Sequence, residues 1–360
     1  MIPYYFLLGI PIFQSVCLSK ASNKPLHKKQ FTVAVTFFIL LFLLMSLRHR
    51  TVGDDVVNYI NLFYNIARTN WNALFVKFDD IEPGYVVLNK LISYISTDEQ
   101  FFLIATTVII LLPISIFYSK KSENTVVSMA IFMILPTYAM MFSGIRQAIA
   151  ISLALPAFEC IKNKKFIRFF LCVLLAYTFH ASAFVMLLLL PIYYLKLSRN
   201  SLLITVPVVG IVYLFNEPIF KYLISLMGEE YAEHYGGITR TSSVMMLILF
   251  ILMAALAYVA IEENQLDRET LALRNILVLS VVLQTFVPIN LLVMRMNYYF
   301  IIFIPILIPR ILNRCAEKNK MLYTFVVYGM TAFFIVYFFV NAYSGEAGLK
   351  LYPHKFFWEG

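Results

Sequence analysis

The sequence predicts an all-α, polytopic integral membrane protein with about twelve transmembrane helices, and three observations support this. Of its 360 residues, 61% are hydrophobic and only 14% are charged, whereas soluble domains are about 45–50% apolar and about 25% charged. Apolar runs of about 15–20 residues recur along the whole chain, which is the length range of membrane-spanning helices. These runs do not alternate between polar and apolar residues, as the strands of a membrane barrel would.

The expected spans follow the apolar runs in order. They are predicted at residues 2–18, 31–47, 100–118, 126–142, 145–161, 166–180, 182–196, 201–216, 243–261, 273–292, 297–312 and 321–340. The stretch 166–196 is interpreted as two short helices that meet near His180; one long tilted helix, or two short legs that do not fully cross, would also fit. We expect residues 1–360 to form a single membrane domain.

Basic clusters between the spans predict the orientation of the chain. The segments "SKASNKPLHKKQ", "KNKKFIR" and "RILNRCAEKNK" fall on one face if the chain turns at His180, and the positive-inside rule makes that face cytoplasmic. The net charge of +9 is thereby explained without a nucleic-acid partner. A loop at 48–98, a second loop at 217–242 and the tail 341–360 then lie on the outer face.

Two further features bound the function. The outer loop contains "EPGYVVLNKLISYI", which is apolar but short, so we expect a helix that lies in the membrane interface. Four cysteines have no metal-ligand spacing and are expected to be small apolar side chains without disulfides. The sequence predicts no metal site and no cofactor.

Arg146 is the first candidate functional residue. It opens the apolar run "SGIRQAIAISLAL", with Gln147 beside it and Gly144 two residues before it. An arginine that anchors a helix end at the membrane surface is the alternative. A charge near membrane depth usually faces a cavity and a partner, and a guanidinium suits forked binding of phosphate oxygens.

His180, in "YTFHASAF", is the second candidate. A core histidine bonded to a carbonyl, or an interfacial histidine, is the alternative. The functional interpretation is a hydrogen-bond donor to phosphate or a proton shuttle.

Acidic and aromatic residues in the outer loop form the third group. In "RHRTVGDDVVNY", Asp54 or Asp55 can cap the helix that follows. Asp55 and Tyr59 would also share one helical face, and an acid beside aromatic rings is typical of sugar-binding surfaces. Glu82, at the start of the expected interfacial helix, is a second candidate acid.

Further arginines lie near helix ends on the same face. Arg295 is followed by the aromatic pair Tyr298 and Tyr299, and helix-end anchoring with an aromatic belt is the alternative for each arginine. The basic side chains that converge there are Arg48, Arg50, Arg146, His180, Arg240 and Arg295. Together with the carboxylates and tyrosines they predict a ligand that is anionic, membrane-embedded at one end and hydroxyl-rich at the other. A polyprenyl pyrophosphate-linked sugar meets these demands.

These segments resemble the EpsG-type, Wzy-like bacterial polysaccharide polymerases of the O-antigen and exopolysaccharide pathways. The matching pieces are "RHRTVGDDVVNY", "EPGYVVLNKLI", "SGIRQAIAISLAL", "TFHASAFVMLLLLPIYY" and "MRMNYYFIIFIPILIP", in the family's order. Asp55 stands at the position of the family's acid, and Asp54 replaces a common threonine.

The resemblance implies a GT-C-like glycosyltransferase of the bacterial inner membrane with a periplasmic active site and no metal. It would transfer the growing glycan from undecaprenyl pyrophosphate to the non-reducing end of a lipid-linked repeat unit in lipopolysaccharide or exopolysaccharide synthesis. The expected partners are undecaprenyl-pyrophosphate-linked oligosaccharides and membrane lipid, with a chain-length regulator protein left open.

On this hypothesis each candidate has a role. Asp55 or Glu82 deprotonates the acceptor hydroxyl, and His180 hydrogen-bonds the pyrophosphate. The expected pyrophosphate ligands are Arg50, Arg146, Gln147, Arg240 and Arg295, and the expected sugar contacts are Asp54, Tyr59, Tyr85 and Tyr299.

Three other functions compete with this prediction. An O-antigen ligase uses the same donor, but ligases carry a large outer loop late in the chain, whereas the largest outer loop here is early. A flippase for lipid-linked sugars should have polar residues through its depth and symmetric halves. A membrane acyltransferase that modifies sugars would leave the outer arginines unexplained.

Overall fold

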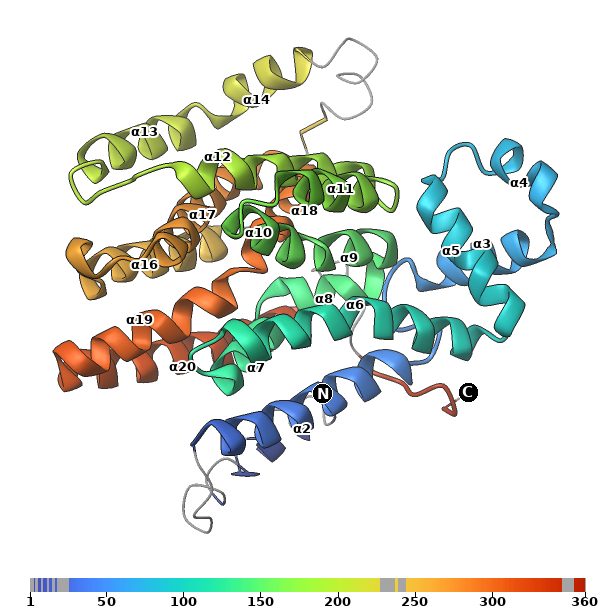
Figure 1. The fold of residues 1–360 in the computed structure, drawn as a ribbon, viewed down its shortest axis with the longest axis horizontal. Coiled ribbons are helices and arrows are strands. Elements are labelled where there is room, and N and C mark those ends of the chain that lie inside the picture. The colour runs from blue at the N-terminus through green and yellow to red at the C-terminus, as the bar shows by residue number, and fades with distance from the viewer. Residues whose placement is uncertain are drawn as a thin grey trace.

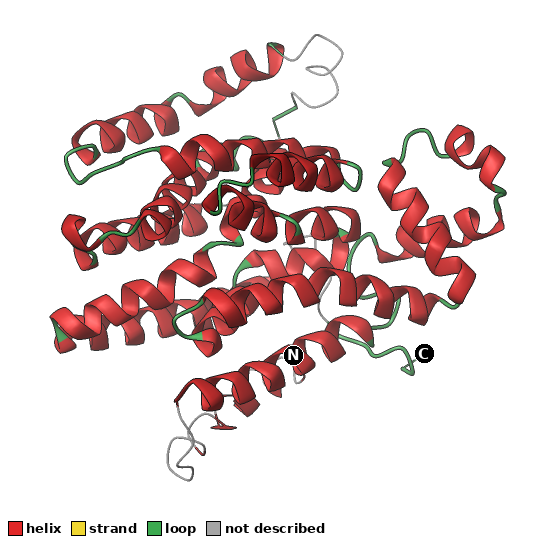
Figure 2. Ribbon diagram, in the orientation of Figure 1, coloured by secondary structure: helices red, strands yellow, loops and turns green. Residues whose placement is uncertain are grey.

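The computed structural model of the 360-residue chain consists of helices packed in a bundle, with a small helical lobe at one end (Figures 1 and 2). It describes residues 26–226, 237–238, 244–344 and 353–359, and scattered residues between 3 and 17. No strand occurs in these ranges, although one isolated β-bridge joins Arg48 to Phe356. The all-α fold class is therefore as predicted.

One described helix is long and apolar enough to cross a membrane by itself. This is α6 (Glu99–Lys121), and up to four spans result if each of three bent helix pairs counts as one. The pairs are α7 (Thr125–Ile134) with α8 (Pro136–Ser143), α13 (Leu202–Leu214) with α14 (Asn216–Ser225), and α18 (Leu291–Ile301) with α19 (Ile304–Lys318), bent by 59°, 82° and 55°. The count of twelve spans therefore stays a prediction.

Further helices make up the rest of the bundle. They are α2 (Leu26–Ser46), α9 (Ile145–Ser152), α10 (Ala154–Lys162), α11 (Phe166–Tyr177), η1 (Ala181–Leu188), α12 (Leu189–Tyr194), α16 (Val244–Ala260), η2 (Glu263–Gln265), α17 (Arg268–Gln284) and α20 (Lys320–Ser344). His180 is extended, with φ −160° and ψ 124°, between α11 and η1. The chain thus breaks at the residue where the turn was expected.

The lobe consists of α3 (Val56–Arg68), α4 (Trp71–Lys77) and α5 (Pro83–Ile95), and it projects from the bundle (Figure 1). Its own small core contains Ile66, Leu74, Phe78 and Val86. The Nζ atom of Lys90 donates hydrogen bonds to the backbone oxygens of residues 67 and 69, at 2.9 and 2.8 Å. This lysine therefore satisfies carbonyls at the end of α3 and fixes α5 against it.

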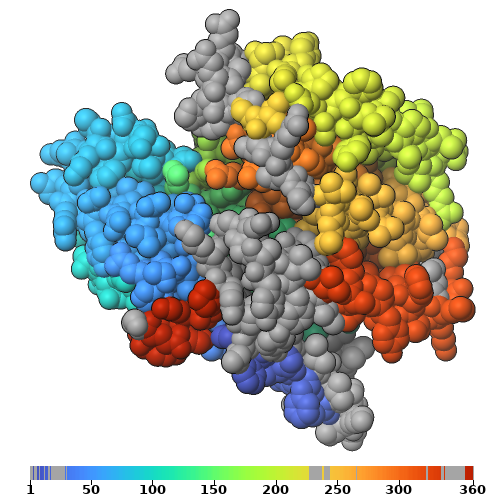
Figure 3. Space-filling view, turned by 180° about the vertical axis from the view of Figure 1, so that it is seen from behind, coloured from blue at the N-terminus to red at the C-terminus, as the bar shows by residue number. Residues whose placement is uncertain are grey.

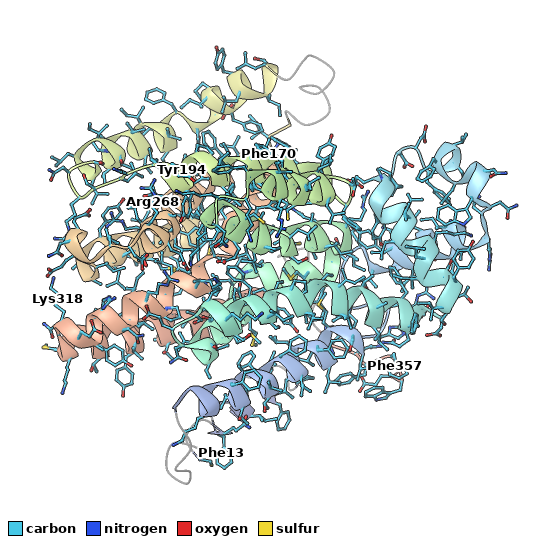
Figure 4. All side chains as sticks on the ribbon, in the orientation of Figure 1. Phe13, Phe170, Tyr194, Arg268, Lys318 and Phe357 are labelled. Atoms are coloured by element: carbon cyan, nitrogen blue, oxygen red, sulfur yellow. The ribbon has the colours of Figure 1, made fainter. Side chains whose placement is uncertain are left out.

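An ion network lies at the other end of the bundle. Glu269 accepts hydrogen bonds from Lys162 and Arg310, which joins α10, α17 and α19. Arg268 and Lys318 lie at this end in Figure 4, away from the lobe. Lys162 and Arg310 therefore have a structural role, and they are not among the residues predicted to bind the substrate.

The C-terminal segment pairs with the end of α2. The Phe357 amide donates to the Leu47 carbonyl at 2.9 Å, and the His49 amide donates to the Lys355 carbonyl at 2.8 Å. Phe357 lies beside this end of the helix in Figure 4. The tail thus closes over the segment that leads into the lobe.

Candidate active site

Glu82 forms the centre of the cluster of predicted site residues. It precedes Pro83, the first residue of α5, but its side chain makes no capping hydrogen bond to that helix. The carboxylate instead accepts from Arg146 Nη1 at 2.5 Å, lies 3.0 Å from His180 Nδ1, and accepts from the Ala181 amide at 3.2 Å. Three segments of the chain thus meet at one carboxylate.

These contacts control the charge of Glu82. Burial by itself would raise the pKa of the carboxyl, but the hydrogen bond from His180 and the charge of Arg146 outweigh that effect and lower the pKa to about 2. Glu82 is therefore ionised at neutral pH. A carboxylate this acidic is a weak base, so its chemistry suits orienting its neighbours.

His180 is held in one tautomer by this pairing. Because ionised Glu82 can only accept, the imidazole Nδ1 carries the proton that faces it. The Nε2 atom makes no hydrogen bond to any residue that the structure describes. This nitrogen is available to a ligand as an acceptor, or as a donor when the ring is protonated.

Arg146 lies against aromatic rings as well as against Glu82. It is the second residue of α9, after Gly144 as the N-cap, and its guanidinium lies 5.9 Å from the centre of the Tyr59 ring. The Tyr59 and Tyr85 rings meet edge to face at 5.8 Å. The contacts with Glu82 and Tyr59 orient the guanidinium of Arg146.

Two buried polar atoms beside this cluster have no hydrogen-bond partner among the residues that the structure describes. They are the Nε–H of Arg146 and the Tyr85 hydroxyl. An unsatisfied buried donor costs about 1–3 kcal/mol. A polar ligand that reaches these two atoms would recover that cost.

Asp55 and Arg295, two more candidates, influence the pKa of Tyr59 in this cluster. Burial raises the pKa of this tyrosine, Arg146 and Arg295 lower it, and Asp55 raises it. Asp55 is the N-cap residue of α3, but its side chain makes no capping hydrogen bond. The helix cap, which was the alternative for Asp55, is therefore absent, and its exposed carboxylate is open to other partners.

Helix α18 contributes through two polar links. The Gln147 side chain donates to the backbone oxygen of Arg295 at 2.7 Å, which ties α9 to α18. The hydroxyl of Tyr299 lies 3.2 Å from that of Ser182, two residues after His180. The Arg295 side chain is itself exposed.

The loop before α3 is clamped onto the turn before Arg146. Gly53 has φ +103°, and a Cβ atom there would lie 2.6 Å from the Phe142 oxygen, so this position requires glycine. The next amide, that of Asp54, donates to the Ser143 hydroxyl at 2.9 Å. The backbone of this loop is therefore held against the end of α8, directly before α9.

The remaining predicted arginines are not part of the cluster. Arg48 is buried and donates to the oxygens of Met45 and Phe142, at 2.5 and 3.2 Å. Arg50 pairs with Glu99 at 3.0 Å. Arg240 lies outside the described residues.

Green residues lie between the blue lobe and the orange part of the bundle in Figure 3. Within the described ranges, no group of three or more His, Cys, Asp or Glu side chains could hold a metal ion. The residues that can contact a ligand here are cationic, aromatic and hydroxyl-bearing.

Comparison with known proteins decides the family. Residues 31–356 match the family model described as the EpsG family. The chain belongs to the EpsG family. No curated protein and no solved structure matches it.

Membership of the EpsG family makes this chain a membrane protein of the polysaccharide polymerase type, with a glycosyltransferase-like activity. In this EpsG protein, sequence analysis selected Glu82, Arg146 and His180 separately but did not predict that the carboxylate joins the other two. It also missed Ser182 and Gly84, of which the latter lies against Thr178. The motif "HASAF" and the glycine after Pro83 were the available signals.

Proposed function

We propose that the protein polymerises O-antigen or exopolysaccharide repeat units at the outer face of the bacterial inner membrane. It would transfer the growing glycan from undecaprenyl pyrophosphate to the non-reducing end of a lipid-linked repeat unit. The observation that carries the proposal is the contact of Glu82 with both Arg146 and His180. That contact fixes a guanidinium and an imidazole side by side, as a pyrophosphate leaving group requires.

The arginines stabilise the departing group. As the bond between the anomeric carbon and the pyrophosphate oxygen breaks, its electron pair leaves with the pyrophosphate. Arg146 offers its unpartnered Nε–H, and Arg295 is exposed and electrostatically coupled to Tyr59. When its ring is protonated, His180 donates a hydrogen bond from Nε2 to the same group. Donors placed where charge develops contribute more than they would in water.

Asp55 is the base in this mechanism. The acceptor hydroxyl oxygen forms the new bond to the anomeric carbon, and its proton passes to the Asp55 carboxylate. Asp55 suits this role because its side chain makes no capping bond and is exposed, whereas Glu82 is occupied and has a pKa of about 2. The half-buried Tyr59 ring is offered to the sugars, and the buried Tyr85 ring packs edge to face against it.

Purified protein in liposomes tests the proposal. Supplied with lipid-linked repeat unit alone, it should form products of several repeats and release one undecaprenyl pyrophosphate per bond, both measured by mass spectrometry. Arg146→Ala should abolish this, while Arg314→Ala, which removes an arginine paired with Glu317 in α19, should not. A product formed only with a lipid A-core acceptor would indicate a ligase. Movement of the lipid-linked unit across the bilayer without a new bond would indicate a flippase.

A further inference from the structure

Helices α4 and α5 of the lobe carry large apolar side chains that remain exposed. The side chains are Trp71, Phe75 and Val76 of α4 and Leu91, Tyr94 and Ile95 of α5, exposed by 40–80%. They lie outside the small core of the lobe, which buries other residues of the same two helices. We call these six side chains the lobe patch. Apolar surface of this kind marks a protein or membrane contact.

The position of the lobe patch along the chain argues for lipid. Helix α6, the described helix that can cross a membrane by itself, begins at Glu99, and the Asp98 side chain caps it. Ile95 precedes that start by four residues, which span at most about 13–14 Å even when extended. The end of α5 therefore lies near the level at which α6 enters the bilayer.

The chemistry of the patch agrees with that level. The Trp71 indole N–H donates to the Tyr94 hydroxyl at 2.7 Å, which joins α4 to α5. Both rings are exposed. Tryptophan and tyrosine concentrate at membrane–water interfaces, where an apolar ring with one polar atom fits best.

We propose that the lobe patch rests in the headgroup region of the leaflet where α6 begins. Because α5 is a continuous helix of 13 residues, about 20 Å long, a membrane contact at Tyr94 and Ile95 keeps its other end within that distance of the headgroups. That end carries Glu82. The membrane thus sets the depth of the lobe relative to the bundle, and this inference does not depend on the proposed reaction.

Tryptophan fluorescence tests the lipid contact directly, because the chain has two tryptophans, Trp71 and Trp358. The full-length Trp358→Phe variant, which retains Trp71, is placed as single copies in nanodiscs whose phosphatidylcholine carries bromine near the top of the acyl chains. Because tryptophan at the membrane interface contacts the top of the acyl chains, Trp71 emission should fall relative to unbrominated lipid, with weak quenching by iodide. Trp358→Tyr repeats the measurement, with tyrosine emission excluded by the excitation wavelength, in case phenylalanine disturbs the tail.

Two results would overturn the proposal. Strong iodide quenching without bromine quenching would show that the patch faces water. The second result concerns discs that hold one or two copies. If iodide quenches strongly with one copy but not with two, and bromine quenches in neither case, the patch contacts a second copy of the chain.

Discussion

The Nδ1 atom of His180 lies 3.0 Å from Oε1 of Glu82, although 98 residues separate them in the sequence. The contact joins the break between α11 and η1 to the start of α5. Because Arg146 binds the other oxygen of the same carboxylate, Glu82 orients both groups that face the ligand. We assign it as a positioning residue.

Replacement of this carboxylate by an amide tests the assignment. Glu82→Gln keeps the shape of the side chain but loses the charge that binds Arg146 and orients His180. A hydrogen bond to a charged group contributes about 1.5–3 kcal/mol, so the transfer rate should fall about 10–100-fold. If the role is positional, kcat should fall while the pH profile of the variant keeps its shape. A lost limb in that profile would identify Glu82 as the base.

The low pKa of Glu82 also predicts how stability depends on pH. The folded-state pKa of about 2 lies below the ordinary value of 4.5, so the ionised carboxylate stabilises the fold. This contribution is complete above about pH 5.5 and is lost as the pH falls through 4.5 towards 2. The difference in apparent Tm between wild type and Glu82→Gln should shrink over that range. A difference that stays constant down to pH 3 would contradict the pairing.

Gly84 should be needed to keep the pairing in register. Its amide donates to the Thr178 oxygen at 2.8 Å, and an added Cβ would lie 2.3 Å from the Thr178 hydroxyl and 2.8 Å from its Cβ. Gly84→Ala should therefore separate Glu82 from His180 and lower kcat with little change in protein level. Adding Thr178→Gly removes both side-chain clashes and should restore part of the rate. Thr178→Gly alone is the control. The added Cβ also lies 2.8 Å from the Thr178 backbone oxygen, and this clash remains in the double variant, so recovery should be partial. A wild-type kcat in Gly84→Ala would refute the explanation.

Arg48 and Arg50 should differ in their effect on stability. Arg48 is 1% exposed and satisfies two carbonyls, so Arg48→Met should lower the free energy of unfolding by about 1–3 kcal/mol. Arg50 is partly exposed in its pair with Glu99, so Arg50→Met should change the free energy of unfolding by less than about 1 kcal/mol. Denaturant unfolding in mixed micelles measures the free energy of unfolding of the two variants. Equal losses would mean that the burial of Arg48 does not determine its contribution.

The sequence was most informative about local structure. Long apolar runs predicted helices, and the short apolar segment "EPGYVVLNKLISYI" became α5 (Pro83–Ile95). The break at His180 followed from the charge pattern on either side of it. The bends were not predicted, because Pro136 and Pro305 let a helix end or restart inside one apolar run.

Contacts between distant residues could not be predicted. Sequence analysis selected Arg48 and Arg146 for the same reason, a charge at the end of an apolar run, yet Arg48 is buried on backbone oxygens and Arg146 faces Glu82. Which partner an arginine meets depends on how helices pack, and a single sequence contains no distance across 64 or 94 residues. For Asp55 the sequence left a helix cap and a functional role open, and in the structure its side chain makes no capping hydrogen bond.

The central claim is that Arg146 binds the pyrophosphate of the donor, and a gel of surface polysaccharide tests it most directly. A strain that lacks the gene is complemented with wild type, Arg146→Lys or Arg314→Lys. Lysine keeps the charge of Arg146 but loses the forked geometry, and losing such a contact should lower the rate about 10²–10³-fold. We predict a ladder for wild type and Arg314→Lys, and a single repeat unit for Arg146→Lys at equal protein level. A full ladder from Arg146→Lys would contradict the account.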